Sequence, residues 1–139
     1  MNPIEYRKIK SSIRRRRGER KTHQRRKVRR QWYNEPLHRR RKQIAAHLSD
    51  ELIERWNVRS LPVRKGDTVL IIRGSFKGHE GKVAGVDVRR RKIKVEGATI
   101  SKTDGTQVAI PIDPSNVIIR KLDLSDRRRR EKLEELASS

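Results

Sequence analysis

The residue types best suited to chemistry gather in a glycine-rich stretch at positions 73 to 82. Cations and glycines are interleaved there: Arg73, Gly74, Lys77, Gly78, Gly81 and Lys82. Glycine lets the backbone adopt angles that other residues resist and lets it come close to a ligand. Backbone amides and basic side chains that approach together indicate contact with phosphate groups.

Residues with β-branched side chains flank this stretch and predict the elements that hold it. Val69 and Ile71 precede it and Val83 follows it, so we expect a strand, a glycine-punctuated loop and a return strand. Farther along, Ile93 and Val95 alternate with charged residues and predict a strand with one solvent-exposed face. The basic run before that strand should form the tip of a second hairpin and contact phosphate, although a solvated turn is the alternative: Arg89, Arg90, Arg91 and Lys92.

The stretch from Arg64 to Val86 resembles the KOW motif, and its flanks make the resemblance more specific. With the segments Val58–Arg64 and Asp113–Val117, the chain resembles the archaeal and eukaryotic branch of the universal L-twenty-four family of large-subunit ribosomal proteins. The resemblance runs from about Trp32 to about Glu134. It implies a small SH3-like barrel that binds large-subunit rRNA on the solvent side near the polypeptide exit, supports early subunit assembly and touches neighbouring ribosomal proteins in the cytoplasm.

The resemblance also implies which positions contact RNA. They include the six positions of the glycine-rich stretch and the basic run Arg89 to Lys92. The others are Lys65 and Gly66, together with His38, Arg39 and Arg40 of the segment Pro36–Arg40. The long basic N-terminus departs from the family pattern. The lack of a long tail after the last helix favours the archaeal side of the branch.

Charge is the dominant feature of the composition. The 139 residues carry a formal charge of +21 with only 32% hydrophobic residues, which favours a nucleic-acid partner over a membrane surface. Residues 1–42 hold eighteen Lys or Arg against three Glu, so +15 of the total lies there. Such a segment should be disordered alone and fold on RNA. Its contact residues are expected to be Arg14, Arg15, Arg16, Arg17, Arg25, Arg26, Lys27, Arg29 and Arg30.

Trp32 and Tyr33 lie within this basic segment. They either stack on unpaired bases or anchor the segment on the protein's own core. Pro36 is expected to open a helix that continues through His47, and Ser49 to cap a second short helix that ends at Asn57. Trp56 should pack on the following barrel rather than on RNA.

The remaining pattern predicts a small closed or half-closed β-barrel of short strands. Residues 97–106 are expected to form a loop with an Asp-Gly turn that suits a hairpin. Gln107–Ile110 and Asn116–Ile119 should form the last strands, and Asp113 should begin a type I turn. Ser125 should cap a marginal final helix. The expected divisions are an RNA-binding arm at 1–42, a short helical linker at 43–60, a mainly β KOW barrel at 61–124 and a C-terminal helix at 125–139.

Several function classes find no support in the residues. There is no cysteine, the four histidines are far apart, and neither a Walker loop nor paired carboxylates occur. We therefore expect no enzyme, metal, cofactor or small-molecule substrate, and no apolar run suits a membrane helix. Two alternatives remain: a KOW-type transcription elongation or other RNA-binding factor, which would need a further domain, and a chromatin-like DNA packager.

Overall fold

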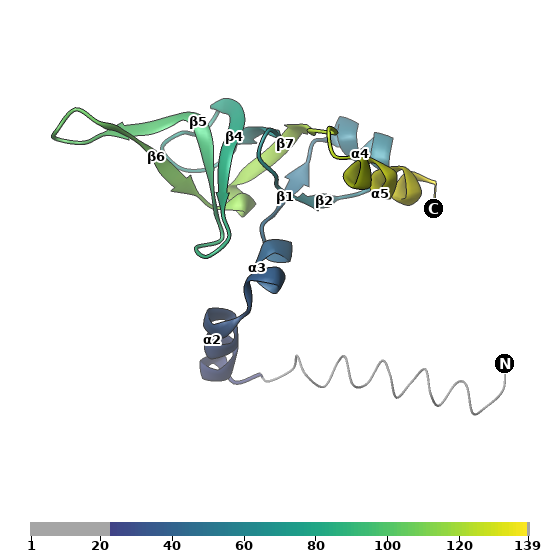
Figure 1. Cartoon of the computed structure of the whole chain (residues 1–139), viewed down its shortest axis with the longest axis horizontal. Coiled ribbons are helices and arrows are strands. Elements are labelled where there is room, and N and C mark those ends of the chain that lie inside the picture. Colours follow the sequence, from purple (N-terminus) through teal and green to yellow (C-terminus); the bar gives the residue numbers. More distant parts are fainter. Residues whose placement is uncertain (1–22, 139) are drawn as a thin grey trace. The chain divides into compact units, whose positions relative to one another are not determined.

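The computed structural model describes residues 23–138, and the expected contacts of Arg14 to Arg17 lie outside that range. The described residues fall into two compact units, one that ends at Glu35 and one that begins at Pro36 (Figure 1). The first unit contains helix α2, Arg25–Asn34, in which no residue is buried. The expectation of an unstructured chain is therefore wrong for this segment. Arginine, lysine and glutamine have high helix propensity, which favours a helix in a segment with no buried residue.

The second unit begins with helix α3, Leu37–Gln43, and strand β1, Ala45–Leu48. The helix expected through His47 therefore stops early. Ala46 and Leu48 are both 2% exposed while His47 between them is exposed, which is the alternation of a strand. β1 pairs with a strand near the end of the chain, in the parallel register His47 with Ile118. Tertiary pairing thus overrides the helical spacing.

Within the described residues, seven strands form one sheet in the order β2-β1-β7-β3-β4-β5-β6. Apart from the parallel pair of β1 and β7, neighbouring strands are antiparallel. The two expected hairpins are present as β3–β4 and β4–β5. The bounds of the remaining strands are β2 Ser60–Pro62, β3 Thr68–Ile71, β4 Glu80–Asp87, β5 Lys92–Ser101, β6 Gln107–Ile112 and β7 Val117–Lys121.

The core of this unit lies on one side of the sheet. Val69, Ile93 and Ile119 are fully buried there, and their neighbours along each strand are more exposed. The sheet order begins at β2 and ends at β6, so it is an open sheet by its pairing. Register shifts between Val83 and Gly85 and between Lys94 and Thr99 bend β4 and β5. The unit is a small, mainly β domain with short helices.

The hairpin expected within residues 97–106 is confirmed, but its loop is shorter than predicted. β5 continues to Ser101, and Ile100 pairs with Val108 of β6 in a hairpin that extends away from the rest of the sheet (Figure 1). The strand continues because Ala98 is completely buried beyond Gly97. Only the turn around Gly105, at φ +82°, matches the expected Asp-Gly turn. The turn at Asp113 is confirmed as the short 3-10 helix η1, Pro114–Asn116.

Helices α4, Asp50–Trp56, and α5, Arg127–Ala137, lie side by side (Figure 1). Ser49 and Asn57 flank α4 as expected, although the Ser49 side chain makes no cap hydrogen bond. α5 is capped by Asp126 rather than by Ser125, because the Asp126 carboxylate accepts from the backbone N–H of Arg128. Trp56 is 8% exposed, so it is buried as expected, but it lies outside the apolar core of the sheet.

Candidate nucleic-acid interface

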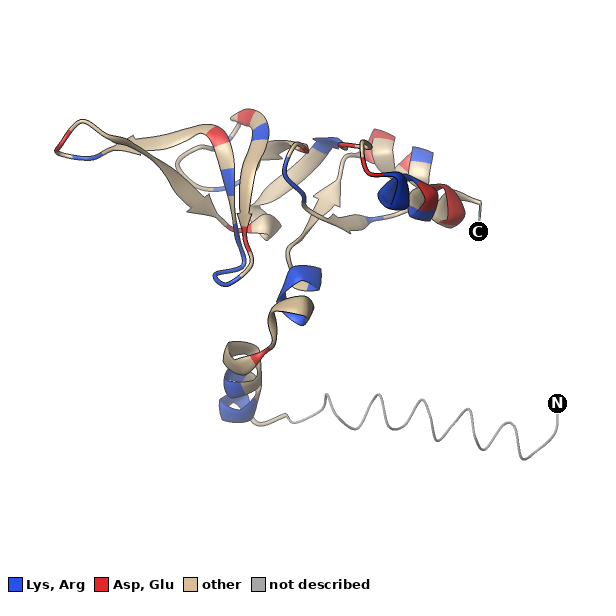
Figure 2. Ribbon diagram, viewed as in Figure 1, with Lys and Arg blue, Asp and Glu red and all other residues tan. Residues whose placement is uncertain are grey.

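Two basic segments that are distant in sequence meet in the second unit. Arg40 of α3 donates from Nη1 to the carbonyl oxygen of Arg89, at 2.9 Å. Arg91 donates from Nε to Oε1 of Gln43, the last residue of α3, at 2.6 Å. Figure 2 shows the resulting concentration of Lys and Arg in α3 and in the turn between β4 and β5. We call these residues, 37–43 and 88–92, the α3–turn surface.

Within the turn, the four predicted contact residues divide into two kinds. Arg91 is only 8% exposed and adopts a left-handed φ of +55°. Lys92 donates to Oδ2 of Asp113 at 2.8 Å, and this hydrogen bond holds the pKa of the Asp113 carboxyl below its usual value. Both cations therefore serve the protein itself. Arg89 and Arg90 are exposed and remain available to a ligand.

The loop between β3 and β4 is tightly closed on itself. Gly78 donates its N–H to the carbonyl of Ile71 at 2.8 Å, and Lys77 donates its N–H to the carbonyl of Gly74 at 3.2 Å. Gly74 and Gly78 have φ of +96° and +87°, and a Cβ at either would meet nothing within 4 Å. The backbone conformation therefore requires glycine at both positions. The side chains of Arg73 and Lys77 are exposed on this loop.

Two further glycines among the predicted contact residues serve close packing within the protein. A Cβ at Gly81 would lie 2.6 Å from the carbonyl oxygen of Glu96 in the neighbouring strand β5. A Cβ at Gly66 would lie 2.7 Å from Oδ2 of the Asp123 side chain, and Gly66 also has a φ of +95°, so the backbone conformation requires glycine there as well. At Gly81, glycine therefore allows the close approach of two neighbouring strands. Lys65 and Lys82 beside them are exposed.

Helix α2 carries the remaining described candidates. Its five cations are all exposed: Arg25, Arg26, Lys27, Arg29 and Arg30. Trp32 is 52% exposed and Tyr33 is 76% exposed, so neither ring is buried in a core. Exposed aromatic rings beside exposed cations suit stacking on bases while the cations hold phosphates.

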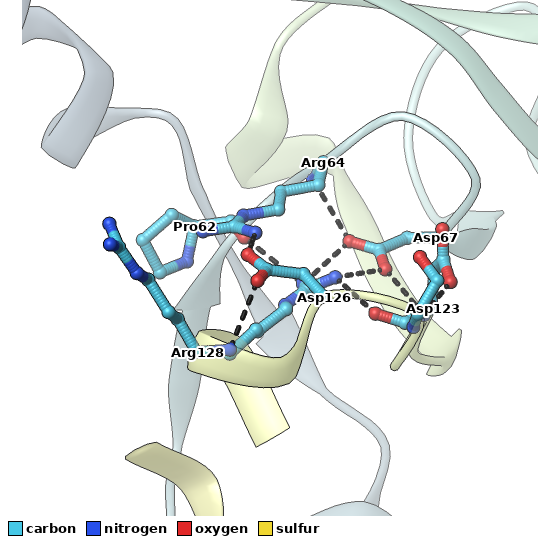
Figure 3. A network of polar contacts seen from close by, with 8 residues as sticks. Pro62, Arg64, Asp67, Asp123, Asp126 and Arg128 are labelled. Atoms are coloured by element: carbon cyan, nitrogen blue, oxygen red, sulfur yellow. Dashed lines mark hydrogen bonds and ion pairs between the residues drawn. The ribbon is translucent and has the colours of Figure 1, made fainter. Parts of the chain in front are cut away.

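A buried charge network, missed from the sequence, fastens α5 to the sheet domain (Figure 3). Asp67 is completely buried, and its carboxylate binds the Arg129 guanidinium through both oxygens, at 2.7 and 2.8 Å. The same carboxylate accepts from the backbone N–H of Arg64 at 2.9 Å and of Asp123 at 2.8 Å. Arg129 also donates to the carbonyl of Asp123 at 3.0 Å. We call this group the Asp67–Arg129 clamp.

The charges at the edge of the clamp are solvent-accessible. Arg64 pairs with Asp126, and this contact lowers the pKa of the Asp126 carboxyl. The pKa of Asp123 is also lowered, chiefly because its carboxylate accepts from the backbone N–H of Ser125. Arg129 and Leu133 are four residues apart on α5 and both are buried, so they lie on the same face of the helix.

Other kinds of site find no support in the described residues. Between residues 23 and 138, no group of His, Asp or Glu side chains is arranged to hold a metal ion. None of the helices in that range is long and apolar enough to span a membrane.

Fold and surface together define a small, mainly β domain with a basic face of the kind that binds a polyanion. The family model that describes the eukaryotic ribosomal proteins L26 and their archaeal L24 counterparts matches residues 22–135. Over 108 residues the chain is 48% identical to the large ribosomal subunit protein uL24 of the archaeon Methanosphaera stadtmanae, and the match covers 78% of this chain and 92% of that protein.

The chain therefore belongs to this family of ribosomal proteins. It is a structural, non-enzymatic protein of the large subunit in the cytoplasmic ribosome. The family match decides against the elongation factor and the DNA packager as alternatives.

Proposed function

We propose that this protein binds large-subunit rRNA mainly through the α3–turn surface. The observation that carries the proposal is the pair of hydrogen bonds, at 2.9 and 2.6 Å, that join α3 to the β4–β5 turn. They hold two basic segments in one fixed arrangement with no acidic residue in either segment. Because the two backbone segments are already fixed to each other, less of the chain has to be ordered on binding, so more of the electrostatic attraction appears as affinity.

The exposed cations of this surface suit phosphates rather than base edges. Arg39 and Arg41 on α3 and Arg89 and Arg90 in the turn are all exposed. Double-helical RNA is recognised mostly through its shape, its phosphates and its 2′-hydroxyls, since its deep groove is closed to side chains. We infer that the α3–turn surface follows the backbone of an rRNA helix, with His38 at its edge.

The β3–β4 loop and helix α2 supply further contacts in this proposal. Arg73 and Lys77 reach phosphate from the rigid loop, and Lys65 and Lys82 contribute charge from the start of β3, where Lys82 pairs with Thr68. Along α2 the exposed cations hold the RNA backbone while Trp32 and Tyr33 stack on unpaired bases. Arg14 to Arg17 are proposed to extend the same basic arm.

The family resemblance also suggests the type of barrel, the domain divisions and the position of the protein in the ribosome. We propose that strands β3 to β7 form its SH3-like KOW barrel, supported by their short lengths, their bends and their shared core. The divisions at residues 42, 60 and 124 are part of that proposal. In the same proposal, the protein lies on the solvent side of the subunit near the polypeptide exit, contacts neighbouring ribosomal proteins and supports early assembly.

The experiment is a titration of the full chain with large-subunit rRNA over a range of salt concentrations, beside a DNA duplex of equal charge. We expect tight rRNA binding, a steep fall of log affinity with log salt because each phosphate contact contributes about 0.7 to 0.9 to the slope, and weaker binding to DNA. Co-sedimentation with large subunits at high salt should accompany it. A slope near zero, or equal affinity for DNA, would contradict the proposal.

A further inference from the structure

A groove of about 280 Å³ lies beside the α3–turn surface, between the β3–β4 loop and the end of β6. Its inner side is apolar: Ile71 and Ile112 are 1% and 8% exposed and belong to the core. Phe76, from the middle of the glycine loop, forms a wall and is half-buried against that core. The volume is at the lower end of ligand-binding clefts, which begin at roughly 300 Å³, so it suits one small planar group.

The rim of the groove is polar and carries positive charge. Arg73, which is exposed, and Asn116 both line the groove. An amide offers two donors and an acceptor, which is the pattern needed to read the edge of a base. Lys92 also lines the groove, beside the Arg89–Arg90 pair that we assign to the RNA backbone.

The one carboxylate on the rim is already engaged. Asp113 accepts from Lys92 Nζ at 2.8 Å and from the hydroxyl of Ser115 at 2.8 Å. Its charge is therefore compensated within the protein and does not oppose a phosphate at Arg73. These features match the parts of a nucleotide. The apolar floor and the aromatic wall suit a flat base, the amide suits its hydrogen-bonding edge, and the cation suits its phosphate.

We propose that this groove holds a single unpaired nucleotide of the rRNA, with its base against Phe76, its edge at Asn116 and its phosphate at Arg73. The inference rests on the proposed rRNA binding and adds a site that reads a nucleotide rather than a backbone. RNA is commonly recognised through unstacked bases that lie on aromatic side chains. The groove also borders the rigid glycine loop, so Phe76 is held in place before RNA arrives.

The first test is photo-crosslinking of the full chain to large-subunit rRNA that contains 4-thiouridine, followed by trypsin digestion. The peptide Gly74–Lys77 is released by cleavage after Arg73 and Lys77 and contains Phe76. We expect a nucleotide adduct on this peptide. Adducts only on peptides of α2 and α3 would overturn the nucleotide site while leaving the proposed function intact. Failure of the wild-type chain to bind rRNA would instead overturn the proposed function.

The second test compares Phe76→Leu with Phe76→Tyr in rRNA titrations. Leu keeps an apolar group on the core but removes the ring, and should weaken affinity about tenfold without a change in the salt slope. Tyr keeps the ring and should bind like the wild type. Unchanged affinity for Phe76→Leu, or an equal loss for both variants, would overturn the proposal.

Because Phe76 also packs on the core, thermal unfolding of each variant accompanies the titration. Asn116→Ala provides an independent measurement, since the backbone hydrogen bonds of η1 do not involve the amide side chain. We expect a loss of affinity of about two- to tenfold with the melting temperature retained. Wild-type affinity for Asn116→Ala would contradict its contact with the base.

Discussion

Two runs of four cations, Arg89–Lys92 and Arg127–Arg130, look alike in the sequence and behave alike in one respect. In each run the third residue points inward, with Arg91 8% exposed and Arg129 7% exposed. The surroundings of the two arginines differ. Arg91 donates to the side chain of Gln43 in α3, whereas Arg129 binds the fully buried carboxylate of Asp67.

The difference separates cations that shape the protein from cations that face a ligand. The Arg91 contact fixes a turn, and the exposed Arg89 and Arg90 then present their charges in a defined place. The Arg129 contact fixes a helix whose exposed face carries several acidic residues, as Figure 2 shows for α4 and α5. Net charge alone therefore does not distinguish cations that are engaged within the protein from cations that are exposed.

The largest effect on the free energy of unfolding is expected from Arg129→Ala. The substitution leaves the Asp67 carboxylate buried with only backbone donors, and breaking a buried pair in this way costs about 3 to 5 kcal/mol. Arg130→Ala on the same helix is the matched control, because Arg130 is exposed and should change stability by no more than about 0.5 kcal/mol. Urea unfolding at pH 7 measures both. Equal effects of the two variants would show that the clamp contributes nothing specific.

Substitutions in the glycine-rich stretch are expected to have an intermediate effect on stability. Gly81→Ala places a Cβ against the backbone of β5, and such overpacking costs about 1 to 3 kcal/mol. Gly78→Ala meets open space but must keep a positive φ, with a strain of about 1 kcal/mol, and Gly78→Val should cost more. Thermal unfolding beside rRNA titration checks this. If Gly78→Val lowers rRNA affinity while its melting temperature is unchanged, the loop glycine serves RNA rather than the fold.

The smallest effect on stability is expected at the edge of the Asp67–Arg129 clamp, from the Arg64–Asp126 ion pair, and it depends on pH. The pKa of Asp126 is lower in the folded protein than its ordinary value, so its ion pair adds stability above about pH 4 and loses it as the pH falls further. Asp126→Asn keeps a helix-capping oxygen but removes the charge. Urea midpoints should differ between the two proteins at pH 7 and converge near pH 2. A constant difference across that range would rule out the ionic contribution.

Local signals were sufficient to predict much of this domain from its sequence. The alternation around Val69, Ile93 and Val95, the glycine turns, and the flanks of α4 at Ser49 and Asn57 all depend on neighbouring residues. These signals predicted the two hairpins and α4. The same signals placed the exposed cations of the turn and of the glycine loop correctly at the surface.

The missed features depend on residues that are far apart in the chain. The spacing of Leu37, Ile44 and Leu48 fits a helix equally well, and only pairing with β7 makes Ala45–Leu48 a strand. Within its run of four arginines, Arg129 has the same residue type as its neighbours, and its partner Asp67 lies 62 residues away in the chain. The inward turn of Arg91 likewise requires Gln43.

The central claim is that exposed and inward-facing cations of one run have separate roles. It is tested most directly by the salt dependence of rRNA affinity for the double variant Arg89→Gln, Arg90→Gln beside Arg91→Gln, with urea unfolding of each. We predict that the double variant flattens the log–log slope by about 1 to 2 units and keeps wild-type stability, because phosphate contacts alone are lost. Arg91→Gln should keep the slope and lose stability. A wild-type slope in the double variant would contradict the claim.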